Sequence, residues 1–224
     1  MPEGILGRKL GMTAIFGEEG RMIAVTVIDT KDNKVLGKRT DSLNGYTAVI
    51  IGVGEKKAKR ANKPTLGFYE KNGLVDDKCG VAHIKREVRE FRIDAETLSK
   101  YTVGELLAGD KLFKVGEIVD VIGVSKGKGF QGVVKKYHFK GSTNSHGQHE
   151  YHRHGGSIGA NTYPAHVFKG KKMPGQMGNA RLTLQNVKIV QVMVEEGILL
   201  IRGGIPGPTG GFVRVQKAVK AKPQ

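Results

Sequence analysis

One run of glycines in this sequence has the spacing of a phosphate-binding motif. Residues 127–132 match the pattern G-x-G-x-x-G, which lets main chain approach phosphate groups in dinucleotide-binding and kinase folds. Residues 133–138 do not predict the packed helix of a dinucleotide fold, and the later sequence lacks the H-R-D and D-F-G motifs of a kinase. No P-loop pattern is present. We therefore interpret these glycines as close-approach positions beside phosphates rather than as a site of nucleotide catalysis.

Four closely spaced histidines suggest a second kind of chemistry, metal binding. His146, His149, His152 and His154 have only Glu150 as a nearby carboxylate and no nearby cysteine, and the ligand spacings of common zinc sites are absent. We therefore expect no metal site; neutral histidines can instead stack on bases or hydrogen-bond phosphates and ribose hydroxyls. Stacking on bases and packing against their own segment both remain open for the aromatic residues nearby, Tyr137, Phe139, Tyr151, Tyr163 and Phe168.

These motifs lie in a basic segment, residues 125–181, that differs from the rest of the chain. It contains ten Lys and Arg against one acid, which is +9 of the chain's formal net charge of +16, and six of the seven histidines. Eleven glycines interrupt it and large aliphatic residues are few, so it cannot bury enough apolar surface to offset its ordering entropy. The basic segment should therefore need a polyanionic partner to become ordered.

The composition of the whole chain favours the same kind of partner. A sequence pI near 9.9 is typical of nucleic-acid binders, with an anionic membrane surface or heparin as the competing partner. No apolar run approaches the roughly 18 residues of a membrane span, and the N-terminus shows no secretion signal. A single cysteine, Cys79, excludes an internal disulfide, suits a reducing cytosol and is interpreted as an incidental or buried thiol. These features predict a cytoplasmic protein. Because no nucleophile triad or carboxylate pair can be assembled from the sequence, we also expect a protein that is not an enzyme.

The elements on both sides of the basic segment read mostly as β-strands. Several short strands separated by glycine turns favour a closed barrel over an open sheet. Since the basic segment leaves one expected strand and returns into the next, it is predicted to be an insertion. The strands are expected at residues 5–7 and 12–16 (joined by a glycine turn), 22–29, 46–53, 115–124, 182–194, 198–202 and 212–215.

The chain between residues 54 and 110 is less regular. Residues 54–63 break the strand pattern with five basic residues, which favours a second phosphate-contacting patch over a merely solvated loop. Residues 64–85 suggest irregular chain with a short helix, and the alternating charges of 85–92 fit an exposed strand or a short helix equally well. We expect a turn at 94–101 and a helical turn at 103–107.

Six blocks of sequence resemble the bacterial form of the large-subunit ribosomal protein L-three family. The resemblance runs from about Ile5 to Val219, and the blocks occur in the family's order. The blocks are Ile5-Leu6-Gly7-Arg8-Lys9-Leu10-Gly11-Met12-Thr13, Ser125-Lys126-Gly127-Lys128-Gly129-Phe130-Gln131-Gly132-Val133-Val134-Lys135, His152-Arg153, Gly156-Ser157-Ile158-Gly159, Val167-Phe168-Lys169-Gly170-Lys171-Lys172-Met173 and Gly175-Gln176-Met177-Gly178-Asn179.

The resemblance implies a mainly β fold with a small α/β part around residues 55–110. The body, residues 1–124 and 182–224, would be a six-stranded β-barrel of the translation-protein type, and residues 125–181 a long, irregular RNA-binding extension. The family further implies direct binding to large-subunit (23S) rRNA, an early role in subunit assembly, and an extension tip near residues 156–166 that approaches the peptidyl-transferase centre. Its implied protein neighbours are L-fourteen and L-nineteen. It implies no membrane partner, no small-molecule substrate, and no cofactor beyond magnesium associated with the rRNA.

Two positions depart from the family's pattern. Thr162 stands where some bacterial members carry a methylated glutamine, so that modification should be absent. Gly155 stands where proline is frequent and leaves the turn less constrained in the free protein. No catalytic or metal residue is assigned. Charge and resemblance together assign rRNA binding to Lys126, Lys128, Lys135, Lys136, Lys140, His152, Arg153, Ser157, Asn161, His166, Lys169, Lys171, Lys172, Gln176 and Arg181, with a second patch of Lys56, Lys57, Lys59 and Arg60.

Overall fold

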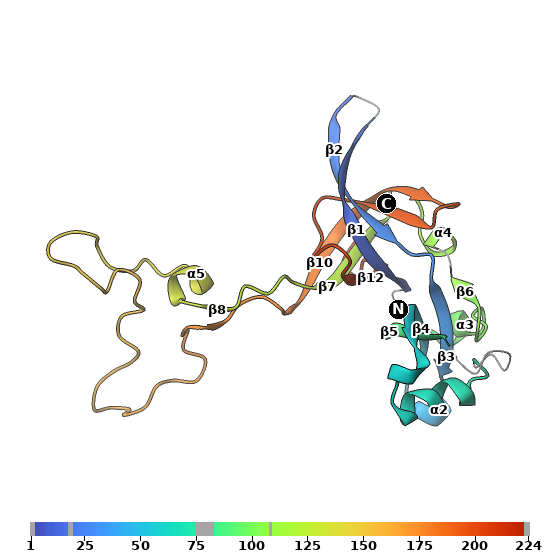
Figure 1. Ribbon diagram of the computed structural model, residues 1–224, viewed down its shortest axis with the longest axis horizontal. Coiled ribbons are helices and arrows are strands. Elements are labelled where there is room, and N and C mark those ends of the chain that lie inside the picture. The colour runs from blue at the N-terminus through green and yellow to red at the C-terminus, as the bar shows by residue number, and fades with distance from the viewer. Residues whose placement is uncertain (1–2, 18–19, 75–82, 108, 222–224) are drawn as a thin grey trace. The chain divides into compact units, whose positions relative to one another are not determined.

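A computed structural model describes residues 3–17, 20–74, 83–107 and 109–221 of the chain (Figure 1). The chain forms two compact units. Unit 1 consists of residues 1–124 and 181–224, and unit 2 of residues 125–180. Cys79, interpreted above as an incidental or buried thiol, lies outside the described residues.

Unit 1 is built on a closed β-barrel in which every neighbouring pair of strands is antiparallel. Alternate side chains point inward and fill the barrel, among them the fully buried Ile5, Val121 and Ile201. The expected six-stranded barrel is thereby confirmed. In spatial order its strands are β1 (Gly4–Phe16), β12 (Phe212–Lys217), β7 (Ile118–Val124), β10 (Arg181–Met193), β11 (Ile198–Arg202) and β2 (Met22–Asp29).

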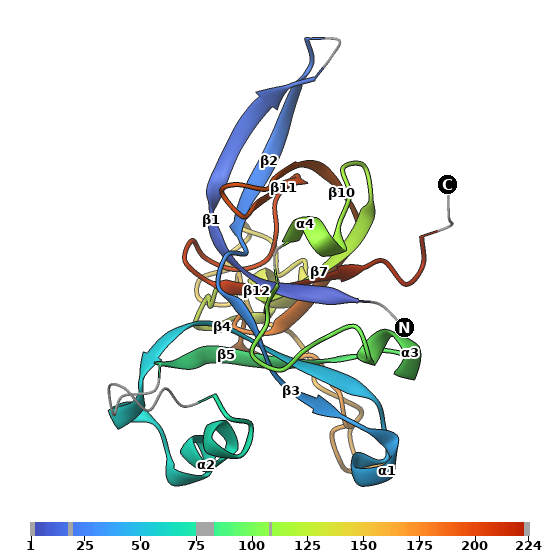
Figure 2. The same ribbon diagram turned by 90° about the vertical axis from the view of Figure 1, so that its right-hand side faces the viewer.

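A four-stranded antiparallel sheet packs against the barrel within unit 1. One face of the sheet buries Phe91 against Leu6 of β1, and the opposite face covers Tyr69 of helix α2 with Leu36 and Ile50. Figure 2 shows α2 beside the sheet formed by β3, β4 and β5. The sheet has the order β5 (His83–Arg92), β4 (Ala48–Lys57), β3 (Asn33–Arg39) and β6 (Leu106–Leu107). The helices of this unit are α1 (Asp41–Asn44), the 3-10 turn η1 (Ala58–Arg60), α2 (Lys63–Lys71), α3 (Ala95–Leu98) and α4 (Gly109–Leu112).

Asn33 links the sheet to the barrel. Its amide nitrogen donates to the carbonyls of Leu6 and Thr30 at 2.7 and 2.9 Å, and its amide oxygen accepts from the Leu6 N–H at 3.1 Å. The side chain is fully buried, so these bonds satisfy all but one of its four hydrogen-bonding positions. Asn33 is also the first residue of β3 and thus of the four-stranded sheet.

Several strands lie where the sequence predicts them. β2 and β11 have the expected bounds, 22–29 and 198–202, and β7, β10 and β12 lie within a few residues of theirs. Their β-branched and aliphatic residues alternate or run continuously, as buried strands do. No described helix combines the length and apolar character that a membrane crossing requires.

The predicted glycine turn between residues 7 and 12 is wrong. β1 runs unbroken from Gly4 to Phe16, with a bulge between Lys9 and Gly11. Position 7 has no room for a side chain, since a Cβ atom on Gly7 would lie 2.3 Å from Ile28 Cγ2. The glycine signal therefore marks close strand packing rather than a turn.

Other differences concern the sheet. β4 continues through Lys57, four residues into the run 54–63 that was expected to break the strand, because Lys57 pairs with His83 across the ladder. Residues 85–92, for which periodicity favoured neither element, belong to strand β5. The predicted helical turn at 103–107 is wrong, since Leu106 and Leu107 form strand β6 against β3. The expected turn at 94–101 contains the short helix α3, and strand β3 was not anticipated.

Candidate nucleic-acid interface

Unit 2 begins and ends with two antiparallel stretches of chain that hydrogen-bond to each other. The Ser125 N–H donates to the Ala180 carbonyl at 2.9 Å, and the Lys128 N–H donates to the Met177 carbonyl at 2.9 Å. Strands β8 (Phe130–Gln131) and β9 (Gly175–Gln176) continue the pairing. Arg181, expected at the end of the basic segment, instead begins β10 of unit 1, where it pairs with Val124.

Gly178 makes this close pairing feasible. Its φ is +71°, and a Cβ atom would lie 2.1 Å from the Lys126 carbonyl oxygen. No other residue type fits a left-handed conformation with this little space. Among the glycines of the G-x-G-x-x-G run, Gly129 also has a positive φ, +68°, with open space where a side chain would lie.

A short helix follows the glycine run, contrary to expectation. Helix α5 spans Val133–Tyr137 and ends at His138, whose φ of 61° is left-handed. Val133 is the one buried residue of this helix; Val134 and Tyr137 are half-buried, and the two remaining residues are lysines. The five-residue helix is not followed by a parallel strand, so the dinucleotide-binding arrangement is absent from unit 2.

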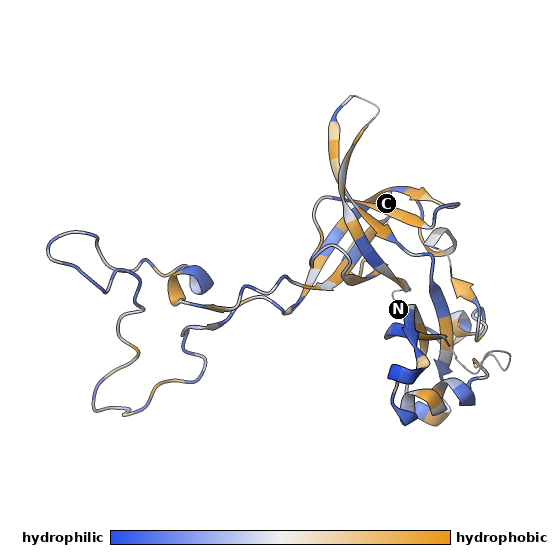
Figure 3. Ribbon diagram, viewed as in Figure 1, coloured by the Kyte–Doolittle hydropathy of each residue, from blue (hydrophilic) through white to orange (hydrophobic). Residues whose placement is uncertain are grey.

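Unit 2 has almost no apolar interior of its own. Val133 is its one buried residue, and all three hydrophobic clusters of the described chain lie in unit 1. Figure 3 shows the same contrast in hydropathy, with apolar strands in the barrel and mostly polar chain in residues 125–180. Between Tyr137 and Gly175 the ribbon in Figure 1 contains neither helix nor strand.

A few local contacts shape the loops of unit 2. The Ser142 N–H donates to the His152 carbonyl at 3.0 Å and closes residues 142–152 into a loop. Gly141 is required beside this contact, since its φ is +75° and a Cβ would lie 2.3 Å from the same carbonyl oxygen. The Nδ1 atom of His152 lies 3.4 Å from the Thr143 carbonyl, which orients the ring.

A concave site of about 290 Å³ brings together three of the predicted basic residues, Arg153, Lys171 and Lys172. Its apolar lining includes Val133, Phe139, Ile158 and Met173, and Ser157 lies at its edge. Cationic heads around an apolar floor suit a nucleotide, whose phosphate is anionic and whose base presents an apolar face.

The predicted residues of unit 2 present their charges to solvent. None of the nine Lys and Arg side chains of residues 125–180, all of them described, forms an ion pair with a described residue. Such an array binds a polyanion without first breaking internal pairs. Lys136 and His152 are half-buried, and the exposed residues are Lys126, Lys128, Lys135, Lys140, Arg153, Ser157, Asn161, His166, Lys169, Lys171, Lys172 and Gln176, with Arg181 exposed in unit 1.

Some aromatic residues of unit 2 pack against their own segment, and others are exposed and open to stacking on bases. Tyr137 and Phe139 are half-buried and pack together at 6.4 Å between ring centroids, with the Lys172 ammonium 5.8 Å from the Tyr137 ring. Tyr163 is 90% exposed, which leaves its ring open for stacking. Tyr151 and Phe168 are also exposed, although each has a histidine ring beside one side.

The second predicted patch lies in unit 1. Lys56 and Lys57 end β4, and Lys59 and Arg60 belong to η1; all four are exposed. No group of three or more His, Cys, Asp or Glu side chains in the described part of the chain has a geometry that could hold a metal ion.

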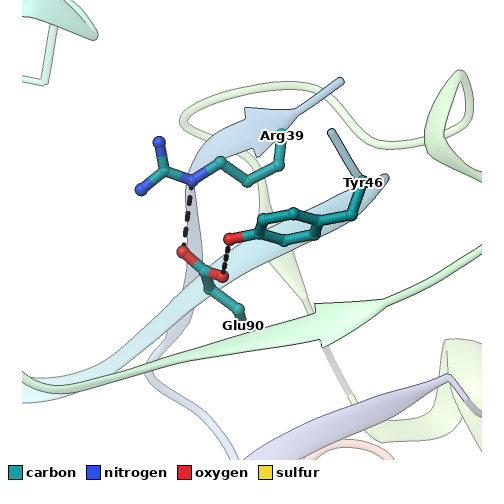
Figure 4. Close-up of polar contacts among 3 residues, drawn as sticks. All are labelled: Arg39, Tyr46 and Glu90. Atoms are coloured by element: carbon teal, nitrogen blue, oxygen red, sulfur yellow. Dashed lines mark hydrogen bonds and ion pairs between the residues drawn. The ribbon is translucent and has the colours of Figure 1, made fainter. Parts of the chain in front are cut away.

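Two arginines of the sheet in unit 1, Arg39 and Arg89, pair with glutamates. The Arg39 Nε donates to Glu90 at 3.2 Å, and the Tyr46 hydroxyl donates to the other oxygen of Glu90 at 2.6 Å (Figure 4). The hydrogen bond to Glu90 raises the pKa of Tyr46. Arg89 pairs with Glu87.

Arg214 differs from these, and the sequence analysis missed it. It occupies an outward position of strand β12, where alternation predicts an ordinary solvated residue. In the structure its Nε atom is buried and has no hydrogen-bond partner among the described residues. No local sequence signal reveals this environment, because the covering residue, Phe91, comes from a distant strand.

We expect fast amide exchange in the loops of unit 2 of the free protein. Of the amides in residues 142–154, Ser142 and His154 donate to a backbone carbonyl, and the others have no backbone acceptor. Hydrogen exchange read by mass spectrometry should show these residues exchanging within seconds, while β7 and β10 stay protected in their ladder. Strong protection throughout residues 142–154 without RNA would contradict this.

Comparison with known proteins places both units in one family. The family model described as ribosomal protein L3 matches residues 88–193. The large ribosomal subunit protein uL3 of Syntrophotalea carbinolica is 43% identical over 220 residues, covering 98% of this chain and 100% of the relative. The proteins of the same name from Thioalkalivibrio sulfidiphilus and Pseudoalteromonas atlantica are each 46% identical, covering 99% of this chain and 100% of the relative. The chain belongs to the ribosomal protein L3 family.

Membership in the ribosomal protein L3 family confirms the resemblance drawn from the six sequence blocks. Because the relatives align over nearly their full length, the family includes the barrel as well as the glycine-rich, basic unit 2.

Proposed function

We propose that the chain is a non-catalytic structural constituent of the large ribosomal subunit that binds large-subunit (23S) rRNA directly. The observation that carries this proposal is the unpaired positive charge of unit 2, a unit with one buried side chain. Relatives of nearly equal length named as large-subunit proteins supply the identity of the RNA. The protein would act in the cytoplasm as part of that subunit.

The mechanism follows from charge and backbone. Lys and Arg side chains of unit 2 replace counterions between RNA helices that lie too close for bare phosphates. Glycines such as Gly141 and Gly178 let main chain occupy places where a side chain would clash. Since few of these contacts read bases, specificity comes mainly from RNA shape.

The finer assignments extend the same proposal. Residues 156–166 would approach the peptidyl-transferase centre, and the protein would support early subunit assembly. Its protein neighbours would be L-fourteen and L-nineteen, and magnesium would take part only as ions held by the rRNA. The exposure of Ile158 and Tyr163, at 52% and 90%, is what a segment buried only by its RNA host requires.

Competition binding tests the proposal against general polyanion binding. The full chain should bind a 23S rRNA fragment much more tightly than heparin or anionic vesicles at matched charge, and should remain with large subunits through a high-salt wash. Equal affinity for heparin and for structured rRNA would identify a general polyanion binder and overturn the assignment.

A further inference from the structure

A pocket in unit 1 gathers three arginines against one acidic residue. It has a volume of about 310 Å³ and is lined by Arg89 of β5, Arg181 of β10 and Arg214 of β12, with Glu87 as the single carboxylate. Glu87 is already paired with Arg89, so the described residues offer no compensating charge to the guanidinium groups of Arg181 and Arg214. Among the described residues Arg181 has no ion-pair partner.

Strand register brings these arginines together. Val213 and Val215 point into the barrel core, so Arg214 between them lies on the outer face of β12, toward the sheet. There its guanidinium carbon lies 4.2 Å from the centroid of the fully buried Phe91 ring. Strand β7 lies between β12 and β10, and its residue Ile122 pairs with Arg214. Val124, two residues further along β7 and so on the same face, pairs with Arg181 of β10.

Arg214 lacks both a hydrogen-bond acceptor for its Nε and a nearby negative charge among the described residues. Burial, followed by the nearby positive charges of Arg181 and Arg89, lowers the pKa of Arg214. An arginine nonetheless stays protonated at neutral pH, so the group remains a half-buried cation. Its buried Nε has no acceptor among the described residues, whereas Arg39 has Glu90 (Figure 4). A bound anion would supply the missing negative charge.

We propose that Arg89, Arg181 and Arg214 form a binding site for one backbone phosphate of RNA on unit 1. Guanidinium groups donate paired hydrogen bonds that match phosphate oxygens, and stacking on Phe91 fixes the plane of the Arg214 group. The volume is about ten times that of a water molecule in the liquid, which leaves room for the adjoining sugar. The identity of the anion as RNA rests on the proposed function; the anion site itself does not.

The first arm of the test uses the full chain without RNA. Inorganic phosphate, exchanged for chloride at constant ionic strength, should raise the unfolding midpoint of the wild type by about 2 °C more than that of Arg214→Met. The general stabilising effect of phosphate acts equally on both proteins and cancels in the comparison. Arg214→Met keeps a chain of similar length against Phe91, so without phosphate it should be at least as stable as the wild type.

The second arm measures binding to a 23S rRNA fragment as a function of salt. Arg181→Gln and Arg214→Met should each weaken binding by about tenfold to thirtyfold, in the range for charged contacts. Because both side chains hold the same phosphate, the double variant should lose little more than either single variant, and the salt slope should fall by about one unit rather than two. Two matched controls should bind nearly as the wild type does: Arg202→Gln, an exposed arginine of β11, and Arg92→Met, an arginine stacked on Tyr46 outside the pocket.

Each outcome decides a different point. Equal stabilisation of the wild type and Arg214→Met by phosphate would overturn the anion site. Phosphate-specific stabilisation with unchanged rRNA binding by the variants would overturn its assignment to RNA. Impaired incorporation into the subunit with unchanged rRNA binding would indicate an acidic protein partner, and would also overturn it. Failure of the wild type to bind rRNA would instead defeat the proposed function, while the phosphate arm would still decide whether the pocket binds anions.

Discussion

Removal of unit 2 should leave a folded barrel that binds RNA far more weakly than the full chain. Val124 and Arg181 are directly opposed in the β7–β10 ladder, so a two-residue Asn-Gly turn can join them after deletion of residues 125–180. The three hydrophobic clusters formed by described residues lie in unit 1 and are retained. We expect a single cooperative unfolding transition with a midpoint within about 4 °C of the full chain, which corresponds to roughly 1 kcal/mol.

The same deletion should lower affinity for 23S rRNA by a factor on the order of 10³ or more at 150 mM salt, since it removes most of the residues proposed to contact phosphates. Filter binding across a salt series measures both the affinity and its slope. A second variant, with residues 125–180 replaced by neutral Gly/Ser chain of equal length, separates lost charge from lost length. An aggregated or non-cooperative deletion variant would show that unit 1 depends on unit 2 for folding.

Simultaneous replacement of Lys169, Lys171 and Lys172 by alanine should produce the next largest effect. The three lysines are exposed and have no ion-pair partner in the described chain, so each is free to neutralise a phosphate. Loss of three contacts should reduce the salt slope by about 2 to 3 units, which corresponds to roughly 100-fold to 500-fold weaker binding at 100 mM salt.

The matched control removes three positive charges elsewhere. Lys38, Lys114 and Lys188 are exposed lysines of unit 1 outside both the predicted patches and the arginine pocket. Their replacement by alanine gives the same change in net charge and should alter the slope by less than one unit. Equal effects of the two triple variants would mean that net charge alone drives binding, and would contradict a localised interface.

The sequence predicted those parts of the fold that depend on local pattern. β2 and β11 are rich in β-branched and aliphatic residues, and their bounds were correct. β3 was missed because its sequence, NKVLGKR, has a polar residue at each end and a glycine within it. Its buried character comes from the layers on either face of the sheet, α2 on one side and the barrel on the other, which no local window contains.

The sequence likewise predicted one part of the candidate interface, unit 2, and missed the other, the arginine pocket. The charge, glycine content and weak apolar character of residues 125–181 are compositional, so unit 2 was evident before its structure was considered. The arginine pocket depends on three strands meeting across a layer boundary, with Arg89 more than ninety residues away from Arg181 along the chain. Arg214 could be recognised only after Phe91 was placed over it.

The pairing of the first and last barrel strands has a consequence for synthesis. Gly4 of β1 pairs with Gln216 of β12, so the ring of strands cannot close until β12 has emerged from the ribosome that makes the chain. The cationic insertion is therefore translated before its scaffold is complete, with most of its surface bare. During that interval the exposed positive charge of the insertion is open to contact with any polyanion, and on the proposed function early binding to rRNA would shorten the interval.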